Sequence, residues 1–79
     1  IEWNMNKKEI LEHLAKIFER SSINESDTLE SLEFDSLILL DLTTFNDKFF
    51  SDLDIKYEDI NKCKNIADII RLYGKKIEN

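Results

Sequence analysis

The chain has 79 residues, a hydrophobic content of 42% and a formal net charge of −6. The length and the hydrophobic content predict one folded domain over residues 1–79 and exclude a disordered chain. The sequence contains no apolar run long enough for membrane insertion. Cys63 is the only cysteine and the start shows no signal-peptide pattern. We therefore expect a cytoplasmic protein without an internal disulfide.

The negative charge is concentrated in the middle of the chain. Between residues 27 and 59 there are ten acidic and two basic residues, a local net charge of −8, whereas the rest of the chain has a net charge of +2. Such an acidic body repels nucleic acid and attracts proteins with basic surfaces. Solubility alone would also explain it. We expect a monomer that has protein partners and no nucleic-acid partner.

A first helix is expected to begin after Asn6, because Asn6 and Glu9 have the spacing of a capping box. The apolar residues that follow recur at helical spacing and predict about four turns. We expect Trp3 and Met5 to pack beneath the start of this helix and His13 to lie at the edge of its apolar side. That side consists of Ile10, Leu11, Leu14, Ile17 and Phe18.

Residues 21–35 form a polar connection, and a second helix is expected over residues 36–50. Leu37 and Leu40 lie off the main apolar side of this helix, beside acidic residues. They predict either a docking patch or a contact with the connection. The expected inner face consists of Leu39, Leu42, Phe45 and Phe49, and the apolar anchors of the connection are Ile23, Leu29, Leu32 and Phe34.

Two shorter helices are expected in the last third of the chain. Residues 57–61 can form a very short helix that carries Ile60, and Asn65 is placed to cap a last helix that ends near Gly74. No period-two alternation indicates a sheet. The predicted fold class is all-α, a small four-helix bundle with a long first connection. The expected inner face of the last helix consists of Ile66, Ile69, Ile70 and Tyr73.

Ser36 lies between an acidic residue and a leucine, at or beside the first residue of the expected second helix. The N–H groups at a helix start have no partner within the helix, and the helix dipole is positive there. A phosphate esterified to Ser36 would be stabilised in that position. Spacing alone favours a simpler role for the Asp35-Ser36 pair, an ordinary N-cap.

The sequence lacks the residue sets that catalysis and metal binding require. His13 and Cys63 could form a base and a nucleophile, but no third group supports them, and one Cys with one His does not make a zinc site. A single glycine excludes a glycine-rich phosphate loop, and Asp52 with Asp54 lacks the glycine and the terminal glutamate of a calcium loop. We therefore expect no metal, no catalytic residue and no enzymatic activity.

Residues 28–37, with the sequence Thr-Leu-Glu-Ser-Leu-Glu-Phe-Asp-Ser-Leu, are followed by Leu40-Asp41-Leu42 and resemble the acyl carrier proteins. That family shows a leucine, a glycine, any residue and then Asp-Ser-Leu, with an apolar–acidic–leucine step along the next helix. The similarity extends to size, acidic balance, helix order, Phe50 near the end of the second helix, and Ile66-Ala67-Asp68 at the start of the last. It implies a four-helix bundle of the acyl-carrier type.

The resemblance implies a carrier and not a catalyst. Ser36 would receive a 4′-phosphopantetheine arm from coenzyme A through a phosphopantetheinyl transferase. The thiol of the arm would hold acyl intermediates as thioesters, in fatty-acid synthesis or in a specialised acyl or polyketide-type pathway. Acyl-transfer and condensing enzymes with basic docking surfaces would recognise Asp35, Leu37, Leu40, Asp41 and Asp47. The acyl chain would lie among Leu42, Phe45, Ile60, Ile66 and Ala67.

Five positions depart from the family pattern, and one of them is Lys56, which follows Ile55 in place of a proline. Glu33 stands where the family usually has glycine, so the turn before Ser36 has to form without a glycine at this position. Asn46 replaces a usual core leucine, Lys48 replaces a usual acidic residue, and Ile38 is apolar where many members are polar. These departures fit a specialised pathway as well as primary fatty-acid synthesis. Two alternatives stay open, an unmodified carrier-like interaction module that uses the same face and an aminoacyl carrier.

Overall fold

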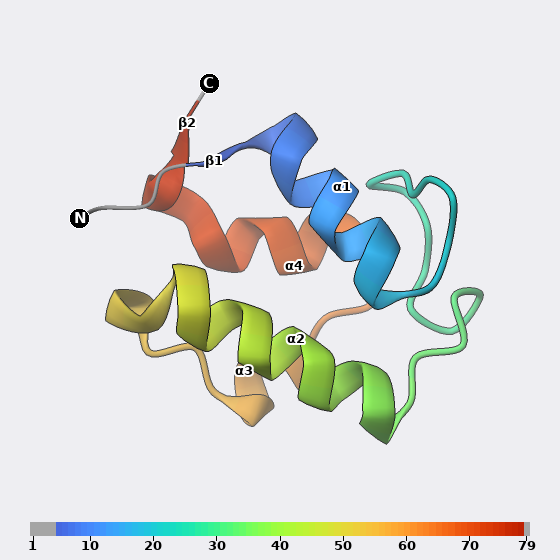
Figure 1. Cartoon of the computed structure of the whole chain (residues 1–79). Helices are drawn as coiled ribbons and strands as arrows, with labels where there is room; N and C mark the ends of the chain where they lie inside the picture. Colours follow the sequence, from blue (N-terminus) through green and yellow to red (C-terminus); the bar gives the residue numbers. More distant parts are fainter. Residues whose placement is uncertain (1–4, 79) are drawn as a thin grey trace.

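The computed structural model describes residues 5–78, which form a mostly helical protein (Figure 1). Its elements are β1 (Met5–Asn6), α1 (Lys7–Ile17), α2 (Ser36–Phe49), η1 (Ser51–Leu53), α3 (Tyr57–Asn61), α4 (Ile66–Tyr73), η2 (Gly74–Lys76) and β2 (Ile77–Glu78). Four α-helices in the described range agree with the expected all-α class, including a very short third helix. The two-residue strands β1 and β2 are an addition that the sequence does not predict.

α1 begins as predicted, at a capping box. The Asn6 side chain accepts a 2.8 Å hydrogen bond from the Glu9 N–H, and the Glu9 side chain accepts a 3.2 Å bond from the Asn6 N–H. Met5 is buried beneath this start, as expected, whereas Trp3 lies outside the described residues. The two reciprocal bonds satisfy N–H groups that the first turn leaves without a helical partner.

α1 ends earlier than predicted, after about three turns instead of four. The Arg20 N–H donates to the Ala15 carbonyl over 2.8 Å, and the Glu19 N–H donates to the Lys16 carbonyl over 3.1 Å. These bonds form a Schellman motif, which requires a left-handed residue, and Glu19 provides it with a φ of 57°. The apolar spacing continues through Phe18 and so gives no sign of this stop.

One apolar cluster forms the core between α1, α2 and α4. Figure 1 shows α2 below α1 and α4, with the long connection running down one side from the end of α1 to the start of α2. The start of α2 therefore lies far from the strand pair in this view. The least exposed members of the core are Ile10, Leu14, Leu42, Phe50, Ile60, Ile66, Ile69 and Tyr73.

The long connection is held against the first turn of α4. The Ile66 N–H donates to the Asp27 carbonyl over 3.0 Å, and the Ala67 N–H donates to the Glu25 carbonyl over 2.9 Å. Lys7 adds a 3.4 Å ion pair to the Glu25 carboxylate. The connection thus satisfies free N–H groups of α4 and packs over the core. Its predicted anchors are confirmed as buried at Ile23, Leu29 and Leu32, with Phe34 half-buried.

The inner face of α2 differs from the predicted one. Ile38 and Asn46 are buried, whereas Leu39 and Phe49 are only half-buried, so the helix is turned relative to the prediction. Asn46 is 3% exposed and accepts a hydrogen bond from a tyrosine of α4. A buried polar group needs such a partner, and α2 alone does not reveal it.

The strand pair joins the two ends of the described range. Met5 pairs with Ile77 and Asn6 pairs with Glu78 in parallel register. Nearby, the Lys76 ammonium lies 2.8 Å from the carboxylate of Asp52 in η1. Two residues per strand are too few for an alternating pattern, which explains why no sheet was expected.

Candidate functional site

Asp35 is the N-cap of α2. Its Oδ1 accepts a 2.9 Å hydrogen bond from the Ile38 N–H, and its carbonyl accepts the Leu39 N–H over 2.9 Å. The backbone of Asp35 is extended, with a φ of −137° and a ψ of −175°. The ordinary N-cap expected for the Asp35-Ser36 pair is therefore Asp35, and Ser36 does not act as the cap.

Ser36 is the first residue of α2 and is exposed. This position leaves its hydroxyl accessible from solvent. The N–H groups of Ser36 and Leu37 precede the first bond of the helix, and the positive end of the helix dipole lies beside them. The structure thus places an accessible hydroxyl next to backbone donors that would stabilise an anion.

The turn before Ser36 depends on a left-handed residue. Glu33 has a φ of 58°, and its N–H donates to the Glu30 carbonyl over 3.1 Å. The Phe34 N–H then donates to the Leu29 carbonyl over 3.0 Å, and the Phe34 ring lies 6.0 Å from the ring of Phe18. Glycine adopts this conformation at little cost, whereas glutamate does not. The backbone here is the one that a glycine would favour, with glutamate in its place.

An exposed apolar and acidic surface follows Ser36 along α2. The exposed fractions of Leu37 and Leu40 are 72% and 57%, and Asp35, Asp41 and Asp47 are also exposed. We call these five residues the recognition face. Because both leucines are mostly exposed, the structure does not support the alternative that they are buried against the long connection. The docking patch itself stays a prediction.

A hollow of about 260 Å³ lies beside the recognition face. Ile38 lines it from α2, and Ile17 and Glu19 line it from α1 and the turn after it. The sequence offers no local sign that these two residues reach the start of α2, because their approach depends on how α1 packs. The remaining lining residues are Asp35, Leu37, Leu40 and Asp41.

None of four hollows among the described residues is lined by all five residues expected around an acyl chain. Leu42, Phe45 and Ile66 are buried in the core. Ile60 lines a hollow of about 340 Å³ next to the long connection. Ala67 lines another of about 430 Å³, together with Lys7 of α1 and Ile77 of β2. Neither hollow includes Leu42, Phe45 or Ile66, so an acyl chain could enter among all five residues only if core side chains moved apart.

His13 and Cys63 make contacts with different elements. The His13 ring lies 5.2 Å from the ring of Phe45 and 5.5 Å from that of Phe49 on α2. The Cys63 thiol is half-buried and donates to the Asp59 carbonyl over 3.4 Å. Burial, followed by the nearby carboxylates, raises the pKa of the Cys63 thiol to about 11. A thiol in this state is a poor nucleophile near neutral pH.

Comparison with models of protein families, with curated proteins and with solved structures finds no match to this chain. Within residues 5–78, no group of three or more His, Cys, Asp or Glu side chains is arranged to hold a metal ion. No helix in the same range combines the length and the apolar character needed to cross a membrane.

Proposed function

We propose that this protein is an acyl carrier whose Ser36 bears a 4′-phosphopantetheine arm. The observation that carries the proposal is the exposed Ser36 hydroxyl at the first position of α2, between the Asp35 cap and the exposed Leu37. The left-handed Glu33, at the position where acyl carriers usually have glycine, supports it further. The protein itself would be a carrier and not an enzyme.

The residues around Ser36 fit a phosphodiester. The Asp35 carboxylate uses one oxygen to accept the Ile38 N–H, which leaves the N–H groups of Ser36 and Leu37 for the phosphate. A diester carries a single negative charge, and the helix dipole offsets part of its repulsion by Asp35. The exposed position gives the arm room to leave the protein surface.

The attachment chemistry requires a partner enzyme. The Ser36 oxygen would form a new bond to the pantetheine-bearing phosphorus of coenzyme A, and the pyrophosphate bond would break to release adenosine 3′,5′-bisphosphate. The hydroxyl proton would pass to a base of the phosphopantetheinyl transferase. The thiol at the end of the arm would then hold an acyl group as a thioester.

The recognition face would be the surface that the transferase and the acyl-transfer and condensing enzymes bind. Leu37 and Leu40 would enter apolar pockets, while the carboxylates of Asp35, Asp41 and Asp47 would meet basic side chains. Exposed charges accelerate encounter and are screened by salt. Such contacts suit a small carrier that must bind and leave several enzymes in turn.

The cargo would be an acyl group of a fatty-acid or specialised pathway, in the cytoplasm. For a long chain, Leu42, Phe45 and Ile66 would have to separate, with Ile60 and Ala67 at the borders of the opened space. A short or polar cargo would need no such opening. An aminoacyl cargo is compatible with the same attachment site.

The proposal is tested by incubating the purified protein with coenzyme A and a broad-specificity phosphopantetheinyl transferase. Intact-mass spectrometry should show the addition of one phosphopantetheinyl group. Ser36→Ala should abolish the addition, whereas Ser51→Ala, at another exposed serine, should leave it unchanged. Absence of the added mass with several transferases, from a folded protein, would argue against the carrier function.

A second candidate is a carrier-like interaction module that never bears the arm. The exposure of Leu37 and Leu40 favours it, because a docking surface for one stable partner would look the same. This module would keep its partner after Ser36→Ala and lose it after Leu40→Asp. A carrier would lose its modification in the first variant and keep a folded structure in both.

A further inference from the structure

Another hollow lies on α1 and shares no lining residue with the recognition face. It has a volume of about 590 Å³ and runs along α1 to the segment that follows it. Its apolar floor consists of Leu11, Ala15 and Ile23, of which the last two are buried. We call it the basic groove, because of the charges on its rim.

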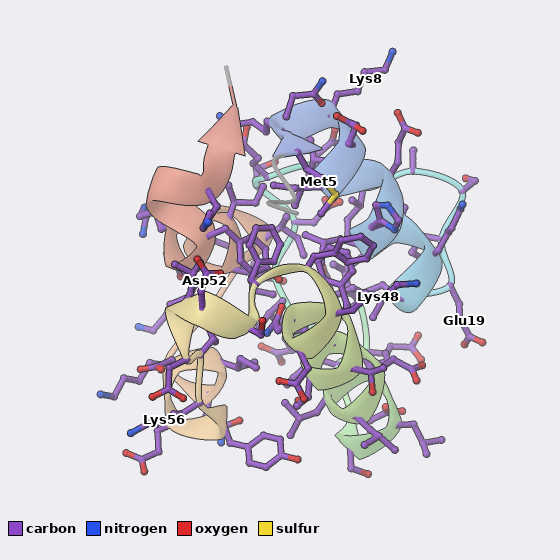
Figure 2. All side chains as sticks on the ribbon, turned by 60° about the vertical axis from the view of Figure 1, so that its left-hand side comes forward. Met5, Lys8, Glu19, Lys48, Asp52 and Lys56 are labelled. Atoms are coloured by element: carbon purple, nitrogen blue, oxygen red, sulfur yellow. The ribbon has the colours of Figure 1, made fainter. Side chains whose placement is uncertain are left out.

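The rim of the basic groove carries four cationic side chains and one carboxylate. Lys7 and Arg20 have partners in the connection, with ion pairs of 3.4 Å to Glu25 and 4.0 Å to Glu33. Lys8 and Lys16 are exposed, and Figure 2 shows Lys8 pointing outward at the upper end of α1. When Glu12, Glu25 and Glu33 are counted against the four cations, the rim keeps a net charge of +1, in a chain whose net charge is −6.

The recognition face has the complementary chemistry. It offers two exposed leucines with carboxylates around them, whereas the basic groove offers an apolar floor with ammonium groups around it. Leu37 and Leu40 are one helical turn apart and project to the same side of α2. Lys8 and Lys16 are about 12 Å apart along α1, and Asp41 and Asp47 are about 9 Å apart along α2, which long lysine side chains can bridge.

We propose that the basic groove of one copy binds the recognition face of a second copy of this chain. The leucines of one copy would cover Leu11, Ala15 and Ile23 of the other, with Asp41 and Asp47 facing Lys8 and Lys16. The groove and the face share no residue, so the contact is heterologous. Few side chains take part, which makes it a weak contact that forms at high protein concentration.

The net charge of −6 opposes any association of two copies at long range. Salt near physiological strength screens this repulsion beyond about 8 Å. At contact, the attraction between the lysines of the groove and the aspartates of the face therefore outweighs the repulsion between the net charges. The contact does not depend on the arm, because it uses no atom of Ser36. It should therefore form equally in Ser36→Ala, which separates this inference from the proposed carrier function.

Sedimentation velocity over a concentration series up to about 1 mM, near 0.15 M salt, tests the contact. The unaltered protein should show a mean mass that rises with concentration. A groove variant, Lys8→Glu with Lys16→Glu, and a face variant, Asp41→Lys with Asp47→Lys, should each associate about tenfold more weakly. Lys62→Glu with Lys64→Glu, which makes the same charge change at exposed positions outside the groove, is the matched control and should associate like the unaltered protein.

The decisive measurement is an equal mixture of the groove variant and the face variant. Each lacks one half of the contact and still has the other, so the mixture should regain association and form a one-to-one complex. A mixture that stays monomeric would overturn the proposal. So would an unaltered protein that is monomeric throughout the series, or a control pair that weakens association as much as the groove pair.

Discussion

The Tyr73 hydroxyl donates a 2.6 Å hydrogen bond to Asn46 Oδ1 inside the core and thereby joins α4 to α2. Both residues are almost completely enclosed, and the Tyr73 ring also stacks on Phe50 at a centroid distance of 4.2 Å. Tyr73→Phe keeps the ring but leaves the Asn46 oxygen without its donor. We expect the free energy of unfolding to fall by about 1–3 kcal/mol, measured by urea denaturation.

The double variant Asn46→Leu with Tyr73→Phe supplies the control for that loss. It removes both polar partners and leaves an apolar contact of similar volume, so it should be more stable than Tyr73→Phe alone. If the two variants were equally destabilised, the hydrogen bond would not be the cause of the loss.

Burial of Tyr73 also predicts how stability depends on pH. Burial raises the pKa of the Tyr73 phenol, so the folded protein keeps its proton where the unfolded chain loses it. Its contribution to stability is intact below about pH 10 and falls as the pH rises above that value, by up to about 1.4 kcal/mol per unit. Denaturation between pH 9 and 11 should show a smaller fall in Tyr73→Phe, whereas Tyr57→Phe, at an exposed ring, should behave like the unaltered protein.

Glu33→Gly should stabilise the protein. Glycine relieves the left-handed backbone at Glu33, where the φ is 58°, and the gain should be about 1 kcal/mol. The pair that is lost, between exposed Arg20 and Glu33 at 4.0 Å, contributes little. Glu12→Gly, within α1, should instead destabilise by about 0.5–1 kcal/mol. Equal losses in both variants, measured by thermal unfolding, would show that residue 33 is not left-handed in solution.

Asp35 should have two separable effects, as a cap and as a charge. Asp35→Ala removes the acceptor of the Ile38 N–H and should lower the free energy of unfolding by about 1 kcal/mol. Asp35→Asn keeps an oxygen acceptor and removes the charge, so it should stay near the original stability. If Asp35→Asn slows modification by the transferase as much as Asp35→Ala does, the charge and not the cap is what the enzyme recognises.

Cys63 should react slowly in the folded protein. Burial, aided by the carboxylates of Asp68 and Asp59, raises the pKa of the thiol to about 11 from its ordinary value of 9.0. The thiolate fraction at pH 8 is then about 100-fold smaller than at the ordinary pKa. Reaction with a disulfide reagent at pH 8 should accelerate by that order after unfolding in urea. Equal rates in the folded and unfolded states would contradict this placement.

Local signals in the sequence predict much of the fold. The capping pairs Asn6 with Glu9 and Asn65 with Asp68 are present, and α3 covers residues 57–61 as expected. Gly74 ends α4 with a positive φ. Each of these features depends on groups within a few residues of one another, which is why a single sequence is enough to predict them.

Some of the errors come from contacts between distant segments, and others come from left-handed residues that are not glycine. Asn46 was not expected on the inner face of α2, because its partner Tyr73 lies 27 residues away. Glu19 and Glu33 adopt left-handed backbones that favour glycine, so the sequence at Glu19 gives no sign of where α1 stops. For the candidate site, the helix start and the exposed leucines follow from spacing, whereas the approach of Ile17 and Glu19 does not.

The most direct test of the carrier proposal is fragmentation mass spectrometry of the protein isolated from its own host. The proposal predicts a phosphopantetheinyl group, with or without an acyl cargo, on the peptide that contains Ser36. An entirely unmodified Ser36 in that protein, or the group attached to a different residue, would contradict it.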